Sequence, residues 1–340
     1  KHMSNESKID LSNSKRPDTA KINVVDEYNN ERSFSITGEL PLTIYVDKKE
    51  IVTLMTLGHY PEALVVGYLR NQGIIEDISQ LKSVHVDWSV NAAAVTTNSL
   101  DLSKVSNKLK HRVVTSGCGQ GTTFGGIMDE LKSNKVNDFM IKQSTIYHLL
   151  KLLHDKNEIY RKSGAVHGCA LCDNDKILDF VEDVGRHNAV DAIAGHMWLN
   201  DISGNDKLFY TTGRLTSEMV IKVAQMNIPT LLSRSGITEM GLSVARETNV
   251  TLLGRAKGKH FLVYNGKDKI EFDYVVMLQP TSPFRNSSHI NQAINKFLKE
   301  NNESLISVKK QDYPPWWLFV LNKNKLGQFL NFKNKNVFNL

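Results

Sequence analysis

The chain has 340 residues, 41% of them hydrophobic and 23% charged, which suits one large domain or two ordinary ones. No run of about 18 apolar residues occurs, which excludes a membrane-spanning helix. The polar N-terminus lacks the apolar core of a secretory signal. Three cysteines, an odd number, argue against a disulfide framework and indicate a reducing cytoplasm. The net charge of +6 could indicate an anionic partner, so its position along the chain matters.

The composition predicts three regions. The first 30 residues are polar, and we expect 1–30 to be disordered or frayed. The last 70 residues hold one of the 21 glycines and carry a net charge of +4, which leaves +2 for the rest. We therefore predict a main domain over 31–270 and a C-terminal fragment over 271–340. The nearly neutral main domain gives no indication of nucleic-acid or membrane binding.

In the first part of the main domain, the sequence pattern predicts two strands and two helices. Alternating apolar residues indicate strands over 42–46 and 51–55. A helical pattern covers 61–69 and is ended by Gly73. A second helix is expected over about 139–154.

From Ser163 onward strands and helices alternate. Strand-like stretches at 176–181, 207–211, 229–233 and 251–254 are separated by helical segments. This order predicts βαβ units, a largely parallel sheet covered on both faces, and hence an α/β fold. Ligands of such sheets bind at the carboxyl ends of the strands.

Two cysteine-containing segments are candidates for chemistry. Cys118 lies in a segment with five glycines in ten residues, which predicts an open loop with an accessible thiol, or else an incidental cysteine. The segment from His167 to Cys172 contains C-x-x-C, but no second C-x-x-C supplies further zinc ligands. We interpret Cys169 and Cys172 as buried strand residues and expect no metal site.

Three turns that follow predicted strands contain arginine: Gly185-Arg186, Gly213-Arg214 and Ser233-Arg234. Free backbone N–H groups beside a guanidinium can hold phosphate or another oxyanion. One such turn is usually ordinary helix capping, here with Thr216 or Ser217 as the cap. Three turns at equivalent places make an anion site and ordinary capping equally good interpretations.

The sequence of the C-terminal fragment predicts a strand that begins at Tyr274 and leads into a proline-bounded loop. A helix with apolar positions from Ile290 to Leu298 and a strand over 304–308 should follow. About 70 residues make a marginal core for an independent domain.

Several motifs over about 33–270 resemble the FdhD family, accessory sulfurtransferases for formate dehydrogenase. These are Glu39-Leu40-Pro41-Leu42, Gly67-Tyr68-Leu69, the Cys118 loop, the segment from Glu182 to Asp191, Thr212-Gly213-Arg214 with Ser217-Glu218, and Ser233-Arg234-Ser235. The resemblance implies a cytidine-deaminase-like α/β core without the deaminase zinc. It also implies a cytoplasmic homodimer.

The resemblance further implies a function and site residues. A cysteine desulfurase of the IscS kind would donate persulfide sulfur to Cys118. The sulfur would pass to the molybdenum cofactor, bis-molybdopterin guanine dinucleotide, before insertion into formate dehydrogenase. The segment Phe261, Leu262, Val263, Tyr264, Asn265 and Gly266 would contact that cofactor, and Arg186, Arg214 and Arg234 would bind its phosphates. Many members have a second loop cysteine where this chain has Gly121. One thiolate can still hold a persulfide, but a mechanism through an internal disulfide is excluded.

Two alternative functions stay open. The chain could be a chaperone that binds the cofactor without moving sulfur. The tail around Gln279-Pro280-Thr281-Ser282-Pro283-Phe284-Arg285 resembles acylneuraminate cytidylyltransferases, which implies cytidylyltransferase activity as a further alternative. The glycine-rich nucleotide loop of that family is absent, so we predict that the tail is an inactive fragment.

Overall fold

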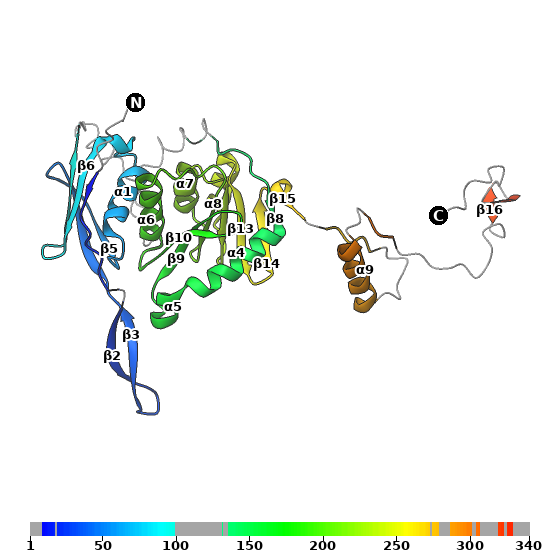
Figure 1. Ribbon diagram of the computed structural model, residues 1–340, viewed down its shortest axis with the longest axis horizontal. Helices are drawn as coiled ribbons and strands as arrows, with labels where there is room; N and C mark the ends of the chain where they lie inside the picture. Colours follow the sequence, from blue (N-terminus) through cyan, green and yellow to red (C-terminus); the bar gives the residue numbers. More distant parts are fainter. Residues whose placement is uncertain are drawn as a thin grey trace. The chain divides into compact units, whose positions relative to one another are not determined.

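The computed structural model describes residues 9–17, 19–98, 131, 135–272, 274–278, 286–300, 304–306, 319–322 and 325–328. The chain divides into two compact units, Lys1–Tyr274 and Val275–Leu340 (Figure 1). Each unit is described by itself.

The N-terminal part of the first unit contains a five-stranded sheet. Its strand order is β1-β6-β7-β4-β5. The strands are β1 (Asp10–Leu11), β4 (Leu40–Val46), β5 (Lys49–Thr56), β6 (Leu81–Asp87) and β7 (Ala92–Thr97). Helix α1 (Pro61–Asn71) packs on this sheet through a shared hydrophobic core. The predicted strand pair and the helix that follows it are therefore confirmed.

The expectation that residues 1–30 are frayed is wrong for the part that the structure describes. Leu11 of β1 pairs with Val84 of β6, and the Ser14 backbone N–H donates to Glu62 Oε1 at 2.9 Å. Strands β2 (Thr19–Val25) and β3 (Glu31–Thr37) form an antiparallel hairpin of their own. Polar composition does not prevent this order, because backbone pairing and one carboxylate hold the segment.

The rest of the first unit is built on a six-stranded sheet in the order β10-β9-β11-β12-β13-β14. Its strands are β9 (His167–Cys172), β10 (Ile177–Asp183), β11 (Leu208–Thr211), β12 (Thr230–Ser233), β13 (Thr251–Lys257) and β14 (His260–Asn265). Only β11, β12 and β13 are parallel neighbours, whereas β9 is antiparallel to both β10 and β11, and β13 to β14. The prediction of an α/β fold is confirmed, but the sheet is mixed rather than largely parallel, because the short β9–β10 and β13–β14 connections are hairpins.

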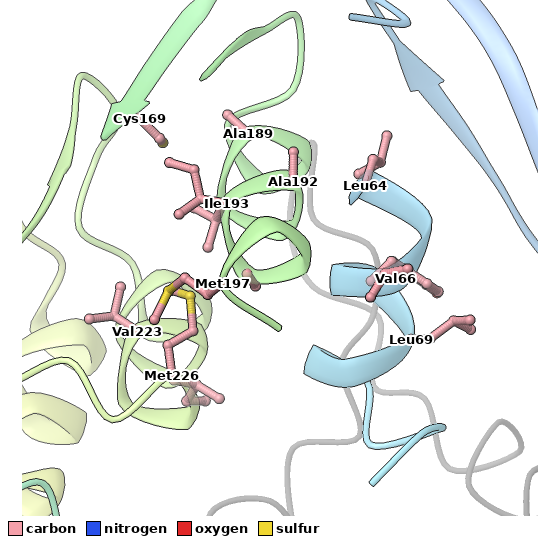
Figure 2. Packing of buried hydrophobic residues seen from close by; sticks show 14 of the residues in the cluster. Leu64, Val66, Leu69, Cys169, Ala189, Ala192, Ile193, Met197, Val223 and Met226 are labelled. Atoms are coloured by element: carbon pink, nitrogen blue, oxygen red, sulfur yellow. The ribbon is translucent and has the colours of Figure 1, made fainter. Parts of the chain in front are cut away.

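Helices cover both faces of this sheet. One face packs against α6 (Arg186–Leu199), α7 (Ser217–Gln225) and α8 (Glu239–Thr248), and the other against α4 (Gln143–Lys156), which is followed by α5 (Glu158–Ser163). Helix α4 begins four residues later than predicted because Ile141 and Lys142 form strand β8 (Ile141–Lys142), paired with β15 (Ile270–Glu271). Figure 2 shows Met197 of α6 beside Val223 and Met226, with α1 on the other side of α6.

Helices α1 and α6 touch through their backbones. A methyl group at Gly67 would lie 1.6 Å from the Asp191 carbonyl oxygen, and one at Gly195 would lie 1.9 Å from that of Ala63. Only hydrogen side chains allow this approach. The contact joins the two sheets of the unit through their helices.

The second unit contains the predicted helix as α9 (Ser287–Glu300) and a hairpin of β16 (Phe319–Asn322) and β17 (Lys325–Gln328). The predicted strand at 274–278 does not form, and 304–306 is not a strand either. Neither segment pairs with a described strand.

Candidate functional site

The three arginine turns lie at one edge of the six-stranded sheet. Because β9 is antiparallel to both β10 and β11, strand β10 runs in the same direction as β11, β12 and β13. The carboxyl ends of these four strands therefore share one edge, together with His167 at the amino end of β9. His167 is paired with Asp183, the last residue of β10. We call this edge the carboxyl edge.

Hydrogen bonds fix the turns of the carboxyl edge to one another. The Arg234 N–H donates to the Thr211 carbonyl at 3.2 Å, and the Leu215 N–H to the Gly236 carbonyl at 3.0 Å. The Ser233 hydroxyl donates to the Gly213 carbonyl at 2.6 Å. The turns after β11 and β12 are thus held side by side, which limits the movement of Arg214 and Arg234.

The structure brings Arg186, Arg214 and Arg234 to this edge, but in different environments. Arg186 is 8% exposed and passes over Gly213, where a methyl group would lie 2.9 Å from its Cδ. Arg214 and Arg234 are exposed, and no acidic side chain among the described residues forms an ion pair with either. Two exposed guanidinium groups without a carboxylate partner favour an anionic ligand.

A pocket of about 490 Å³ opens at the same edge. It is lined by Tyr160, Gly164, Ala165, Val166, His167, Thr212, Arg234 and Ser235. The pKa of His167 lies below its ordinary value of 6.5, first because of burial and then because of the charges of Arg186 and Arg214. The pocket therefore combines positive charge with an imidazole that is neutral at pH 7.

Other polar residues of the same motifs are structural. Asp183 accepts hydrogen bonds from the Thr56 hydroxyl at 2.6 Å, the Leu57 N–H at 3.1 Å and the Asn188 amide at 2.9 Å. These bonds join the end of β5 to the turn before α6. Burial raises the pKa of Asp183, and these donors oppose that effect.

Asp191 of α6 and Lys222 of α7 form a fully buried ion pair of 2.8 Å. The Asn71 amide also donates to Asp191, at 2.7 Å. Glu182 accepts the first N–H groups of α5 at Ile159 and Tyr160. These carboxylates are engaged in the interior and have no surface that a ligand could reach.

Helix capping at the arginine turns differs from the prediction. Thr216 occupies the N-cap position of α7, but neither it nor Ser217 makes a side-chain capping bond there. The Thr216 hydroxyl is buried without a hydrogen-bond partner among the described residues. Capping therefore does not account for the sequence of the turn after β11.

The predicted cofactor segment from Phe261 to Gly266 lies apart from the pocket. Phe261, Leu262, Val263, Tyr264 and Asn265 belong to β14, the outermost strand, and none of them lines the pocket. Phe261 packs against Tyr147 and Tyr264 against Gly254, whereas Leu262 and Val263 are exposed. Gly266 follows the strand with a φ of 77°.

Of the three cysteines, Cys118 lies outside the described residues. Cys169 and Cys172 are fully buried and belong to different hydrophobic clusters on opposite faces of β9. Burial raises the pKa of each thiol to about 12. They cannot act together as a C-x-x-C site, and among the described residues no cluster of His, Cys, Asp or Glu could hold a metal ion.

His167, Thr212 and Ser235 line the pocket. The sequence motifs contain all three, but the sequence alone did not predict them as ligand-binding residues. Ser235 and Thr212 adjoin predicted arginines, but His167 is brought in only by the antiparallel pairing of β9 with β10. If the segments 167–172 and 177–183 had been recognised as a hairpin, the sequence would have predicted His167 at this edge.

No helix in the described part of the chain is long and apolar enough to cross a membrane.

Comparison with known proteins identifies the family. The sulfur carrier protein FdhD of Bacillus pumilus is 31% identical over 75% of this chain and 98% of its own length. That of Bacillus subtilis is 32% identical over 68% of this chain and 88% of its own. A crystal structure from Desulfotalea psychrophila, described as that of a formate dehydrogenase accessory protein, matches with a TM-score of 0.59 and 26% identity over 74% of this chain and 98% of its own.

The family model matches residues 37–271, which ends close to the end of the first compact unit at Tyr274. The matched range includes the three arginine turns of the carboxyl edge. The chain belongs to the FdhD/NarQ family.

Proposed function

We propose that this chain is a cytoplasmic sulfurtransferase that carries sulfane sulfur on Cys118. Family membership supports this, since relatives that are 31% and 32% identical to this chain are named sulfur carrier proteins. The donor is a cysteine desulfurase of the IscS kind. The acceptor is the molybdenum cofactor, bis-molybdopterin guanine dinucleotide, destined for formate dehydrogenase.

The loading step needs only one cysteine. The Cys118 thiolate attacks the outer sulfur of the donor persulfide R–S–SH, so that a new S–S bond forms on Cys118 and the S–S bond of the donor breaks. The donor leaves as the thiolate R–S⁻ and takes up the proton that Cys118 lost. The sulfur of Cys118 is oxidised and that of the donor is reduced. This exchange does not need a second cysteine at position 121, which is Gly121 in this chain.

The carboxyl edge is the proposed site for the phosphates of the cofactor. The observation that carries this is the exposed Arg214 and Arg234 beside the pocket, without carboxylate partners among the described residues. The buried Arg186 adds positive charge close to His167. The segment from Phe261 to Gly266 does not line the pocket, and its proposed role is to contact the part of the cofactor that extends beyond the pocket, through the exposed Leu262 and Val263.

Mass spectrometry tests sulfur loading. After incubation with desulfurase and cysteine, the wild-type chain should gain about 32 Da on the peptide containing Cys118. A variant with Cys169→Ala and Cys172→Ala should gain the same mass, because those thiols are buried. If the wild-type chain binds the cofactor but gains no sulfur, it is instead a chaperone. If Cys118→Ala still restores formate dehydrogenase activity in a deletion strain, the sulfur-carrier role is wrong.

Guanine-nucleotide binding tests the phosphate site. With GDP as the probe, Arg214→Ala should weaken binding by about tenfold, the effect of about 1.4 kcal/mol. Arg246→Ala removes the same charge from the last turn of α8 and serves as the matched control. Equal affinity of Arg214→Ala and wild type would remove Arg214 from the site.

The homodimer is also part of the proposal, and sedimentation of the full chain at several concentrations tests it. A sedimenting mass of one chain at all concentrations would contradict it.

A further inference from the structure

A fourth arginine stands at the carboxyl edge in an unusual backbone conformation. Arg255 lies within β13 and has a φ of 54°. The other described non-glycine residues with positive φ are Asn29, Asp47, Lys48, Asn91, Asp201, Asn227 and Asn249, and all of them lie in turns. Arg255 alone in this set lies inside a strand. Arginine has no side-chain group that favours this conformation locally, unlike asparagine or aspartate.

The surrounding strands explain how this conformation is held. The register of β13 with β14 shifts between Leu252 and Leu253 and again between Gly254 and Lys257, so Arg255 lies in an irregular stretch of the ladder. Its backbone N–H donates to the Ser235 carbonyl at 3.0 Å. Such irregularities turn a side chain away from its regular direction and occur often beside functional sites.

The turned side chain reaches the turn after β12. A methyl group at Gly236 would lie 3.5 Å from both Nε and Nη2 of Arg255, so the guanidinium lies against the glycine backbone. Arg255 is exposed, and no acidic side chain of the described ranges forms an ion pair with it. The guanidinium is therefore positioned but not neutralised.

Arg234, directly after β12, and Arg255, within β13, occupy equivalent positions on neighbouring segments. Leu232 pairs with Leu253, and each arginine follows its leucine by two residues. Arg234 and Ser235 line the pocket, and Arg255 is bonded to Ser235. The carboxyl edge thus places a second exposed guanidinium next to the pocket arginine, on the side away from His167 and Arg214.

We propose that Arg255 binds the second of two linked oxyanions, so that the site selects a diphosphate over a monophosphate. One guanidinium fork satisfies one oxyanion by two parallel hydrogen bonds, so a second linked phosphate needs its own donor. This inference rests on the proposed phosphate site and adds the residue that determines its specificity. It uses no chemistry beyond binding.

Arg255→Gly is the decisive variant because glycine adopts a φ of 54° without strain. The variant should melt at or above the temperature of the wild type, so that a loss of binding is not a loss of folding. By calorimetry with the full chain, GDP should bind about tenfold more weakly. GMP should bind within about twofold of its wild-type affinity.

Two further variants sharpen the test. Arg255→Lys keeps the charge but not the fork, and its GDP affinity should lie between those of wild type and Arg255→Gly. Arg246→Ala removes an exposed arginine from the opposite end of α8 and should change neither affinity.

The outcomes separate this inference from the proposed function. If Arg214→Ala weakens GDP binding and Arg255→Gly does not, the phosphate site stands and the role of Arg255 is wrong. Equal weakening of GDP and GMP by Arg255→Gly would overturn the diphosphate selectivity. If the wild-type chain binds neither nucleotide, the phosphate site and this inference both fail, while persulfide formation on Cys118 is tested independently.

Discussion

Two regions of the first unit hold charged side chains in opposite ways. Between α6 and α7, Asp191 and Lys222 are fully buried and form an ion pair of 2.8 Å. At the carboxyl edge, Arg214, Arg234 and Arg255 are exposed and form no ion pair with the described residues. The buried charges belong to the interior and stabilise one arrangement of helices, whereas the exposed ones are left for a ligand. Substitutions in the first region should therefore change stability and those in the second should change binding.

The largest expected effect is on the buried side. Lys222→Met leaves the Asp191 carboxylate buried without its cation, which should lower the free energy of unfolding by about 3–5 kcal/mol in urea titrations. Adding Asp191→Leu should recover part of this loss, because no buried charge then remains. Arg32→Met removes an exposed partner of Asp26 at a similar distance of 2.7 Å and should change the free energy of unfolding far less, because solvent screens the pair. Similar losses for Lys222→Met and Arg32→Met would contradict the comparison.

The helix contact that frames this region should be nearly as sensitive. In Gly195→Ala the new methyl group would lie 1.9 Å from the Ala63 carbonyl oxygen, so α1 and α6 must separate. We expect a loss of about 3 kcal/mol by thermal or urea unfolding, at the upper end for overpacking. Gly38→Ala is the control, since a methyl group there meets no atom within 4 Å. An unchanged midpoint for Gly195→Ala would show that the two helices are not in backbone contact.

At the carboxyl edge we expect an effect on the pH dependence of GDP binding. Burial and then the charges of Arg186 and Arg214 lower the pKa of His167 below 6.5, so its imidazole is mostly neutral at pH 7. A bound phosphate offsets the repulsion and should raise this pKa, so GDP affinity should rise as the pH falls below 6.5. A rise of one unit corresponds to about tenfold in affinity.

NMR titration of the His167 ring with and without GDP measures this pKa directly. His167→Gln should flatten the part of the pH profile that His167 contributes, leaving only the titration of the phosphate. A His167 pKa that does not move when GDP binds would place the anion elsewhere.

The smallest effect is expected at the buried thiols. Because their pKa is about 12, Cys169 and Cys172 should not react with iodoacetamide at pH 8 in the folded chain, but should react fully in urea. Cys172→Ala should lower stability by about 1 kcal/mol, as for loss of one buried heavy atom. Labelling of Cys172 at the same rate in folded and unfolded protein would contradict its buried position.

Local pattern was sufficient for much of the fold. The alternation at 42–46 and 51–55, the helical spacing at 61–69 and the strands ending before the arginine turns all correspond to observed elements. These signals depend on residues close together in the chain, which is why they could be read directly. The start of α4 was missed because Ile141 and Lys142 pair with β15, far away in sequence. The order of residues 9–30 was missed for the same reason, since β1 depends on β6.

The site divides in the same way. Local patterns were enough to predict that Arg186, Arg214 and Arg234 follow strands, that Cys169 and Cys172 belong to an apolar strand, and which family the motifs resemble. Which charged side chains are buried in ion pairs and which remain exposed follows only from the three-dimensional fold, because burial depends on the packing of distant elements. The fold also brought His167 to the pocket through the antiparallel β9 and turned Arg255 toward Gly236 through an irregular strand pair. Strand direction and ladder register are set by partners elsewhere in the chain, and no local pattern contains them.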